Sequence, residues 1–238
     1  MKSVFLSLSG VFSDEGRAPD IDLRSIEGTV CYCSEEAAAS LRAAIACVPL
    51  ETVHWIDTGD FHYLTLLFLE RVTEPFSLVL FDHHSDDRKS PFETDEMLGC
   101  GSWVADAKRR LPQMREVIGI GPDDCDGKGC LNVPSGAGAD SAFSCNGTAD
   151  CICAEASLPV YLSIDLDVLK KSEFSTDWDQ GEMTLGSLLD AVKKLATSHR
   201  IIGIDICGGI TAAQGASGCE LTANAAVRDF LVNFFENY

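Results

Sequence analysis

The sequence is poor in basic residues and in long apolar runs. It holds 18 Lys and Arg against 37 Asp and Glu, a formal net charge of −19. This balance disfavours nucleic acid and anionic membranes as partners, and favours small cationic substrates or cationic peptides. No run approaches the roughly 18 apolar residues of a membrane span. Residues 1–10 alternate polar and apolar side chains before an acidic stretch, unlike a signal peptide. We therefore expect a cytoplasmic protein.

The chain also lacks any Cys-x-x-Cys pair, although it contains 11 cysteines. Most lie in strand-like or helix-like segments, where reduced thiols act as small core residues. A Gly-rich and Ser-rich stretch over residues 121–157 holds five others: Cys125, Cys130, Cys145, Cys151 and Cys153. This stretch has no hydrophobic periodicity, which predicts a long insertion loop on the side of the functional site. We expect these cysteines to be plain thiols. A structural zinc ion and a disulfide stay open as alternatives.

Alternating strand and helix patterns predict one α/β domain over residues 1–238, with 46% hydrophobic residues for its core. Strands are expected at residues 4–8, 29–33, 52–56, 76–81, 117–120, 158–164 and 201–206. Helices are expected at residues 35–47, 60–72, 103–111, 185–197 and 225–235. Ser34 and Asn224 are the expected N-caps of the first and the last helix. This order predicts a three-layer α/β/α sandwich with a mostly parallel sheet.

A group of ligand-type residues begins where the apolar strand at residues 76–81 should end. Asp82, His84 and Asp86 follow it, at the edge where open α/β sheets bind ligands. If the extended geometry persists, these three side chains point to one side and His83 points to the other. The alternative is a solvated acidic loop.

Two further segments have the same design. The apolar residues 158–164 lead into Asp165 and Asp167, which would be costly to bury without a cation. His62 follows a strand end and a Gly turn, and Asp57 and Asp60 are candidates to orient its ring. Carboxylates and imidazoles without a thiolate suit Mn²⁺ better than a structural zinc site, with Zn²⁺ or Fe²⁺ as alternatives.

The order of these residues resembles the ureohydrolase family of arginase, agmatinase and formiminoglutamase. The Asp-x-His-x-Asp signature is present at residues 82–86 and the Ser-x-Asp-x-Asp signature at residues 163–167, and Gly-Asp-Phe-His62 is similar to a family metal ligand. The resemblance implies an arginase/deacetylase-like fold and two Mn²⁺ ions. The first would be held by His62, Asp82, Asp86 and Asp165, and the second by Asp82, His84, Asp165 and Asp167.

The resemblance also implies hydrolysis of a guanidino or amidino C–N bond, with release of urea from an arginine-like substrate. Asp86 and His83 are the candidate catalytic residues, although His83 could equally pack beneath the loop. Asp205 is expected to be a buried supporting residue of the late strand. His54 is expected to be structural.

Departures from the family pattern bear on the substrate. Gly208 stands where the family has a guanidinium-binding Glu, and residues 98–103 contain no counterpart of the proton-shuttling His. A larger substrate, such as arginine within a peptide, is therefore also expected. The segment Asp177, Trp178 and Asp179 could form a replacement cation-binding wall, or only an exposed turn.

Two other functions are kept as alternatives. One is a one-metal zinc deacetylase-like amidohydrolase, since that class shares this architecture and uses an Asp-x-His with a later Asp. The other is a metal-binding homologue without catalysis. The number of bound ions and the release of urea would separate these possibilities.

Overall fold

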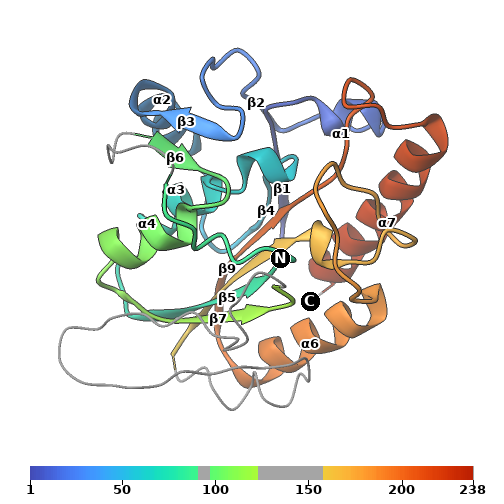
Figure 1. Cartoon of the computed structure of the whole chain (residues 1–238). Helices are drawn as coiled ribbons and strands as arrows, with labels where there is room; N and C mark the ends of the chain where they lie inside the picture. Colours follow the sequence, from blue (N-terminus) through green and yellow to red (C-terminus); the bar gives the residue numbers. More distant parts are fainter. Residues whose placement is uncertain (91–96, 123–157, 238) are drawn as a thin grey trace.

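The structure, a computed structural model, describes residues 1–90, 97–122 and 158–237. Its centre is a seven-stranded sheet of order β2-β1-β4-β9-β8-β5-β7, in which neighbouring strands run parallel (Figure 1). The strands are β1 (Ser3–Ser7), β2 (Ile21–Asp22), β4 (Val53–Trp55), β5 (Phe76–Phe81), β7 (Met114–Ile120), β8 (Val160–Asp165) and β9 (Ile201–Cys207). The predicted parallel sheet is confirmed. The five cysteines predicted to lie in an insertion loop fall outside the described residues.

Helices cover both faces of the sheet and complete three layers (Figure 1). The helices α2 (Glu35–Ile45), α3 (Leu64–Leu69) and α4 (Trp103–Arg110) share one apolar core with Leu78 of β5. The helices α1 (Val11–Asp14), α6 (Leu185–Ser198) and α7 (Gly218–Glu236) share the other core with Val79. Successive strand residues thus enter opposite cores, as expected for a parallel sheet buried on both faces. Within the described ranges, no helix is long and apolar enough to cross a bilayer.

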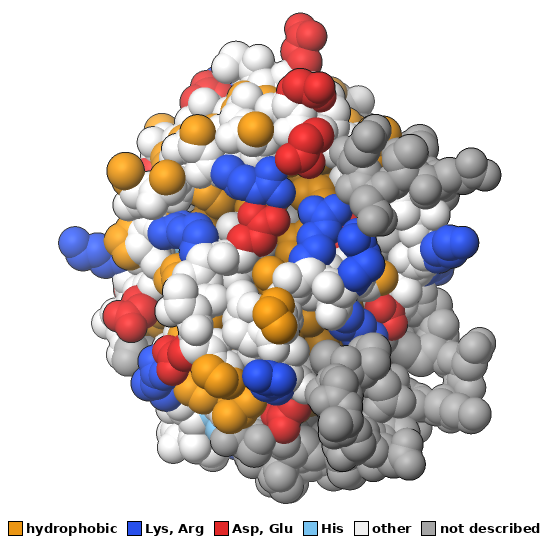
Figure 2. All heavy atoms as spheres, turned by 90° about the vertical axis from the view of Figure 1, so that its left-hand side faces the viewer, with side chains coloured by type: hydrophobic (Ala, Val, Ile, Leu, Met, Phe, Trp, Pro, Cys, Tyr) orange, Lys and Arg blue, Asp and Glu red, His pale blue; other side chains and the backbone are white. Residues whose placement is uncertain are grey.

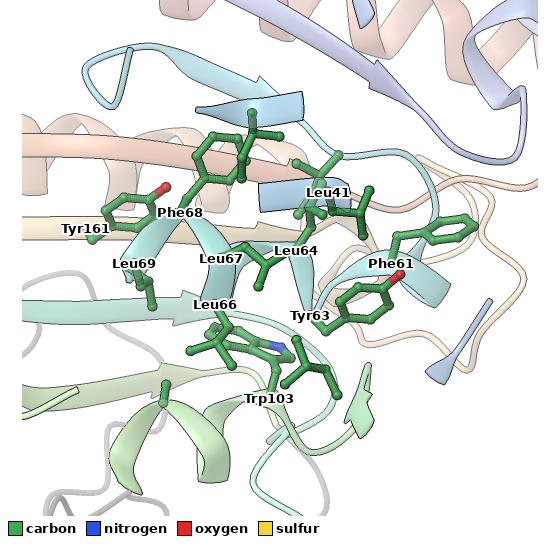
Figure 3. Packing of buried hydrophobic residues seen from close by; sticks show 14 of the residues in the cluster. Leu41, Phe61, Tyr63, Leu64, Leu66, Leu67, Phe68, Leu69, Trp103 and Tyr161 are labelled. Atoms are coloured by element: carbon green, nitrogen blue, oxygen red, sulfur yellow. The ribbon is translucent and has the colours of Figure 1, made fainter. Parts of the chain in front are cut away.

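The helix predicted at residues 60–72 is shorter than expected. A 3₁₀ turn, η1 (Gly59–Phe61), comes first, and all side chains of α3 are buried. Figure 3 shows α3 between Leu41 of α2 and Trp103 of α4. A helix that is apolar on every side must be buried. This packing fixes the backbone at His62, which lies between η1 and α3.

The strand predicted at residues 29–33 is displaced and lies outside the main sheet. It is β3 (Tyr32–Ser34), which pairs antiparallel with β6 (Met97–Gly99) in a separate two-stranded sheet. Cys31 just before it has a left-handed backbone, with φ of 56°. An extended strand cannot continue through that conformation.

The last helix begins before the predicted residue 225. Ser217 caps α7 and forms a capping box with Glu220. Asn224, the predicted N-cap, lies inside the helix and is buried. Its side chain instead bonds the backbone N–H and C=O of Ser175, at 2.9 and 2.8 Å.

The sheet has a topological switch between β5 and β8. These strands are neighbours, but α4 after β5 and α6 after β8 cover opposite faces. Such a reversal opens a crevice at the carboxyl ends of the strands. The register pairs Phe81 with Ile164, so Asp82 and Asp165 follow at neighbouring positions. The two sequence motifs therefore meet at this crevice.

Candidate metal centre

One cluster of candidate ligands surrounds His62. Its Nδ1 atom lies 3.2 Å from Asp82 Oδ2, 3.0 Å from Asp86 Oδ2 and 3.5 Å from Asp165 Oδ2. All four residues are buried. They come from the turn before α3, the loop after β5 and the end of β8. The structure thus brings together the four residues predicted for the first ion.

A second cluster surrounds His84. Its Nδ1 atom lies 2.9 Å from Asp167 Oδ2 and 3.6 Å from Asp82 Oδ1. Asp82 therefore faces both clusters, with one oxygen toward each imidazole. Asp165 directs Oδ2 toward His62, while its Oδ1 accepts the backbone N–H of Asp167 at 2.9 Å. The candidate ligands of the two ions are thus contiguous.

The loop after β5 does not remain extended, although Asp82, His84 and Asp86 line one pocket and His83 does not, as the alternation predicts. The backbone bends at residues 83–84, and Asp86 has φ of 50°. Aspartate tolerates this left-handed conformation better than most residues. The indole Nε1 of Trp103 donates to Asp86 Oδ2 at 2.6 Å. The carboxylate reaches His62 because the loop turns back and α4 holds it there.

The donor set fits divalent cations. Asp82 Oδ2 is buried and accepts no hydrogen bond from the described residues, which is costly for a carboxylate. Burial, followed by the charge of Asp86, raises the pKa of Asp82. Burial, followed by Asp167, raises the pKa of Asp165 to about 6. Bound cations would offset the repulsion among these carboxylates.

The two imidazoles also carry shifted pKa values. Hydrogen bonds to Asp167 and Asp82 raise the pKa of His84 to about 11. Burial works against protonation of His62, but Cys207, Asp82 and Asp86 around it raise its pKa well above the ordinary value. A metal ligand must be a neutral imidazole, so metal binding at this centre would release protons.

Ser163 holds the ring of His62. Its hydroxyl lies 2.8 Å from Nε2, the nitrogen that faces away from the carboxylates. The predicted orienting residues make other bonds: Asp57 accepts the backbone N–H groups of residues 8 and 9, and Asp60 accepts from Cys31 Sγ and Trp178 Nε1. Asp57 has φ of 73°, and its carboxylate ties the end of β4 to the end of β1. The signal for Ser163 was its place in the Ser-x-Asp-x-Asp motif.

Asp205 is confirmed as a buried supporting residue. Its Oδ1 atom accepts from the hydroxyl of Tyr161 at 2.8 Å and lies 2.6 Å from Nδ1 of His54. The other ring nitrogen of His54 lies 2.8 Å from the carbonyl of Pro49, and the ring stacks on Phe68. His54 is therefore structural, as predicted.

A pocket of about 60 Å³ opens onto both clusters and is lined by all six candidate ligands. A water molecule needs roughly 10–15 Å³ of such space, so there is room for several waters or a small group. Arg88, Cys100 and Trp178 also line the pocket. Trp178 is 40% exposed at the rim, with its ring centroid 5.9 Å from that of His84.

The other predicted site residues lie around this pocket without lining it, so their roles stay predictions. Asp177 is half-buried beside Trp178 and accepts from Gln214. Asp179 is exposed. The backbone N–H of His83 donates to Asp167 Oδ1 at 3.0 Å, and its ring meets that of His84 edge-on.

Backbone fills the space around Gly208, the position where the resemblance to ureohydrolases implies a guanidinium-binding Glu. Gly208 has φ of 107°, and an added Cβ would lie 2.9 Å from Asp165 Oδ1 and 3.0 Å from the backbone nitrogen of Leu166. Its own N–H donates to the carbonyl of Asp57 at 3.0 Å. Both the close approach and the left-handed backbone require glycine.

Comparison with known sequences gives one informative likeness. An uncharacterised protein of Thermotoga maritima is 31% identical over 156 residues. The match covers 66% of this chain, and the chain spans 57% of that relative's length. No family model matches the chain.

Solved structures of ureohydrolases share the architecture. Arginase from Bacillus cereus superposes with a TM-score of 0.62 at 15% identity, covering 98% of this chain and 97% of that one. Formiminoglutamase from Trypanosoma cruzi, described with Mn²⁺, superposes with a TM-score of 0.61 at 12% identity, covering 98% of this chain and 92% of that one. Proclavaminate amidino hydrolase from Streptomyces clavuligerus superposes with a TM-score of 0.58 at 15% identity, covering 84% of this chain and 70% of that one. The chain therefore has the arginase-like α/β fold of these ureohydrolases, at 12–15% sequence identity.

Proposed function

We propose that this protein is a binuclear-metal hydrolase that cleaves a guanidino or amidino C–N bond of a small cationic, arginine-like substrate. The observation that carries the proposal is the convergence of two imidazoles and four carboxylates on one pocket, with Asp82 facing both clusters. The likeness in fold to arginase, agmatinase and formiminoglutamase supports the same chemistry.

The two ions would take the ligand sets that the resemblance to ureohydrolases implies. One set is His62, Asp82, Asp86 and Asp165, and the other is Asp82, His84, Asp165 and Asp167. Oxygen-rich donors of this kind suit Mn²⁺. When bound, paired divalent cations supply Lewis acidity and acidify a water at the pocket. The reaction adds the water oxygen to the guanidinium carbon, breaks the C–N bond and releases urea and a protonated amine.

The side chains of the rim would bind the substrate. The face of the Trp178 ring suits a planar guanidinium. Its Nε1 donates to Asp60 at 3.2 Å, so negative charge lies beside the ring. Asp86 and His83 are the candidates to accept a proton from water and return it to the leaving amine.

Specificity for free arginine is not required by this proposal. The position of the family's Glu is Gly208, whose surroundings leave no room for a side chain. Recognition of the guanidinium would then come from the exposed rim, which suits arginine within a peptide or another amidine.

The test is urea release by protein loaded with Mn²⁺. Free arginine, agmatine, formiminoglutamate and arginine-containing peptides would each be supplied, and urea, formamide and amine measured. We expect two ions per chain by elemental analysis and turnover of at least one substrate. One ion per chain with deacetylase activity would favour the deacetylase-like alternative. Bound metal without product from any substrate would contradict the proposal.

A further inference from the structure

The structure places a thiol among the candidate metal ligands, which the sequence pattern did not predict. Cys207 ends β9, and the register pairs it with Asp165 of β8. It is fully buried, and its Sγ donates to Asp165 Oδ2 at 3.0 Å. Sulfur, the carboxylate oxygen and a ring nitrogen of His62 all lie within 4.8 Å of one another. Three donors at these separations can reach one cation.

We propose that Cys207 is a further ligand of the ion held by His62 and Asp165, to which it binds as a thiolate. This inference rests on the metal centre proposed above. On binding, the thiol proton leaves to solvent, and both Sγ and Asp165 Oδ2 turn their electron pairs toward the cation. The carboxylate then no longer accepts the S–H hydrogen bond.

The surroundings of Cys207 differ from those of an ordinary core cysteine. Cys33 is also fully buried, but its Sγ donates to a backbone carbonyl, that of Ser34 at 3.5 Å. Cys207 instead directs its proton to a candidate ligand. The unsatisfied oxygen of Asp82 lies 3.2 Å from the same imidazole, His62. A cation beside His62 would therefore satisfy an oxygen that the described residues leave without a donor.

A thiolate would make the two ion sites unequal. Soft sulfur favours Zn²⁺, Fe²⁺ or Co²⁺ over Mn²⁺. The other cluster, of Asp82, His84 and Asp167, contains only oxygen and nitrogen donors. The ion beside His62 would thus be of a softer type, and the ion beside His84 would retain a preference for Mn²⁺.

The test uses Co²⁺, whose thiolate complexes absorb in the near ultraviolet. The whole protein would be titrated with Co²⁺, and we expect this absorption to develop with one equivalent. It should vanish in Cys207→Ser and Cys207→Ala, and persist in the matched controls Cys33→Ser and Cys100→Ser. Competition of Zn²⁺ with Mn²⁺ should shift toward Mn²⁺ in Cys207→Ser by at least about 10-fold, the lower end for loss of a group that supports a metal.

Absorption that survives in Cys207→Ser would come from other thiols and would overturn the inference. If the variants do not fold, X-ray absorption at the zinc edge of the wild-type protein with one ion decides. A Zn–S distance of about 2.3 Å supports the inference. A zinc ion with only nitrogen and oxygen ligands, at about 2.0 Å, contradicts it. Thiolate binding without hydrolysis would contradict only the proposed function. Hydrolysis without a thiolate signal would contradict only the role of Cys207.

Discussion

At the scale of single residues, motif spacing predicts which side chains gather but not the conformations that gather them. Asp82, His84 and Asp86 meet their partners, yet through a bent loop instead of an extended strand. Cys207 was missed because a small thiol in an apolar strand has the pattern of a core residue. The hydrogen bond from Trp103 to Asp86 was also missed. An aromatic residue at the start of a helix has the pattern of a core residue, and the sequence gives no sign of the partner of its N–H group.

The shared position of Asp82 gives a direct test of the centre. We expect Asp82→Ala to lower turnover by more than about 100-fold, beyond the cost of losing an outer partner of a metal ligand, because both clusters lose a donor. Asp87→Ala is the matched control, since Asp87 lies in the same loop but pairs with Lys108 at 2.7 Å. Full activity of Asp82→Ala in urea assays, with its circular dichroism unchanged, would rule out the shared ligand.

Asp177 should make substrate binding depend on pH. Burial, followed by the charge of Asp60, raises the pKa of Asp177 to about 7. The carboxylate is neutral below that value and charged above it. The KM for a cationic substrate should therefore fall as pH rises through 7, by up to about fivefold, the worth of a partly exposed ion pair.

The variant Asp177→Asn should lose this dependence and keep the higher KM, with kcat little changed. Asp179→Asn is the control, because Asp179 is exposed whereas Asp177 is half-buried. A wild-type KM that stays constant across this pH range would remove Asp177 from substrate binding.

At the scale of elements, continuous apolar runs predict the central strands well and the helix ends poorly. Both β5 and β8 are buried along their whole length, so their composition alone marks them. The start of α7 depends on a capping box at Ser217, and β3 depends on a partner strand that lies far away in the sequence. Local patterns do not contain that tertiary information.

The helix α4 should influence the metal centre through one hydrogen bond. Trp103→Phe removes the indole N–H that holds Asp86 but keeps most of the ring beneath α3 (Figure 3). We expect metal affinity to fall about 10–100-fold, as for other partners of metal ligands. Trp55→Phe is the control, because Nε1 of Trp55 has no hydrogen-bond partner among the described residues. Equal affinities of the two variants, measured by calorimetry, would contradict this role.

At the scale of the whole molecule, the net charge of −19 does not describe every face. Figure 2 shows Lys and Arg side chains gathered near the centre of one side of the molecule. The helices α2 and α4 carry basic side chains that pair with acids, as Arg42 does with Glu70 and Arg109 with Asp106. The acidic composition predicts that the protein attracts cations. The structure shows buried carboxylates concentrated at the switch between β5 and β8.

These carboxylates should make the metal-free protein less stable as pH rises. Burial raises the pKa of Asp165 and of Asp167 from 3.8 to about 6. Protons therefore bind the folded state more tightly than the unfolded state, so their stabilising effect is lost between pH 4 and 6. The pKa of His84 is raised from 6.5 to about 11, which extends the loss of stability to higher pH.

We expect the unfolding temperature of the metal-free protein to fall over this range, and Mn²⁺ to raise it more above pH 7 than below pH 5. Calorimetry of Asp165→Asn is the control, and its decline should be shallower and its response to Mn²⁺ weaker. An unfolding temperature that does not respond to Mn²⁺ at any pH would contradict the centre.

The crowded backbone at Gly208 also bears on how such a protein could change its substrate. Any side chain introduced there meets Asp165 and Leu166, so an acid cannot be placed at this position by one substitution. Such a change would need the neighbouring turn to be rebuilt first, at the expense of a candidate ligand. Engineering of a new specificity should therefore begin at the rim, where the side chain of Trp178 is exposed.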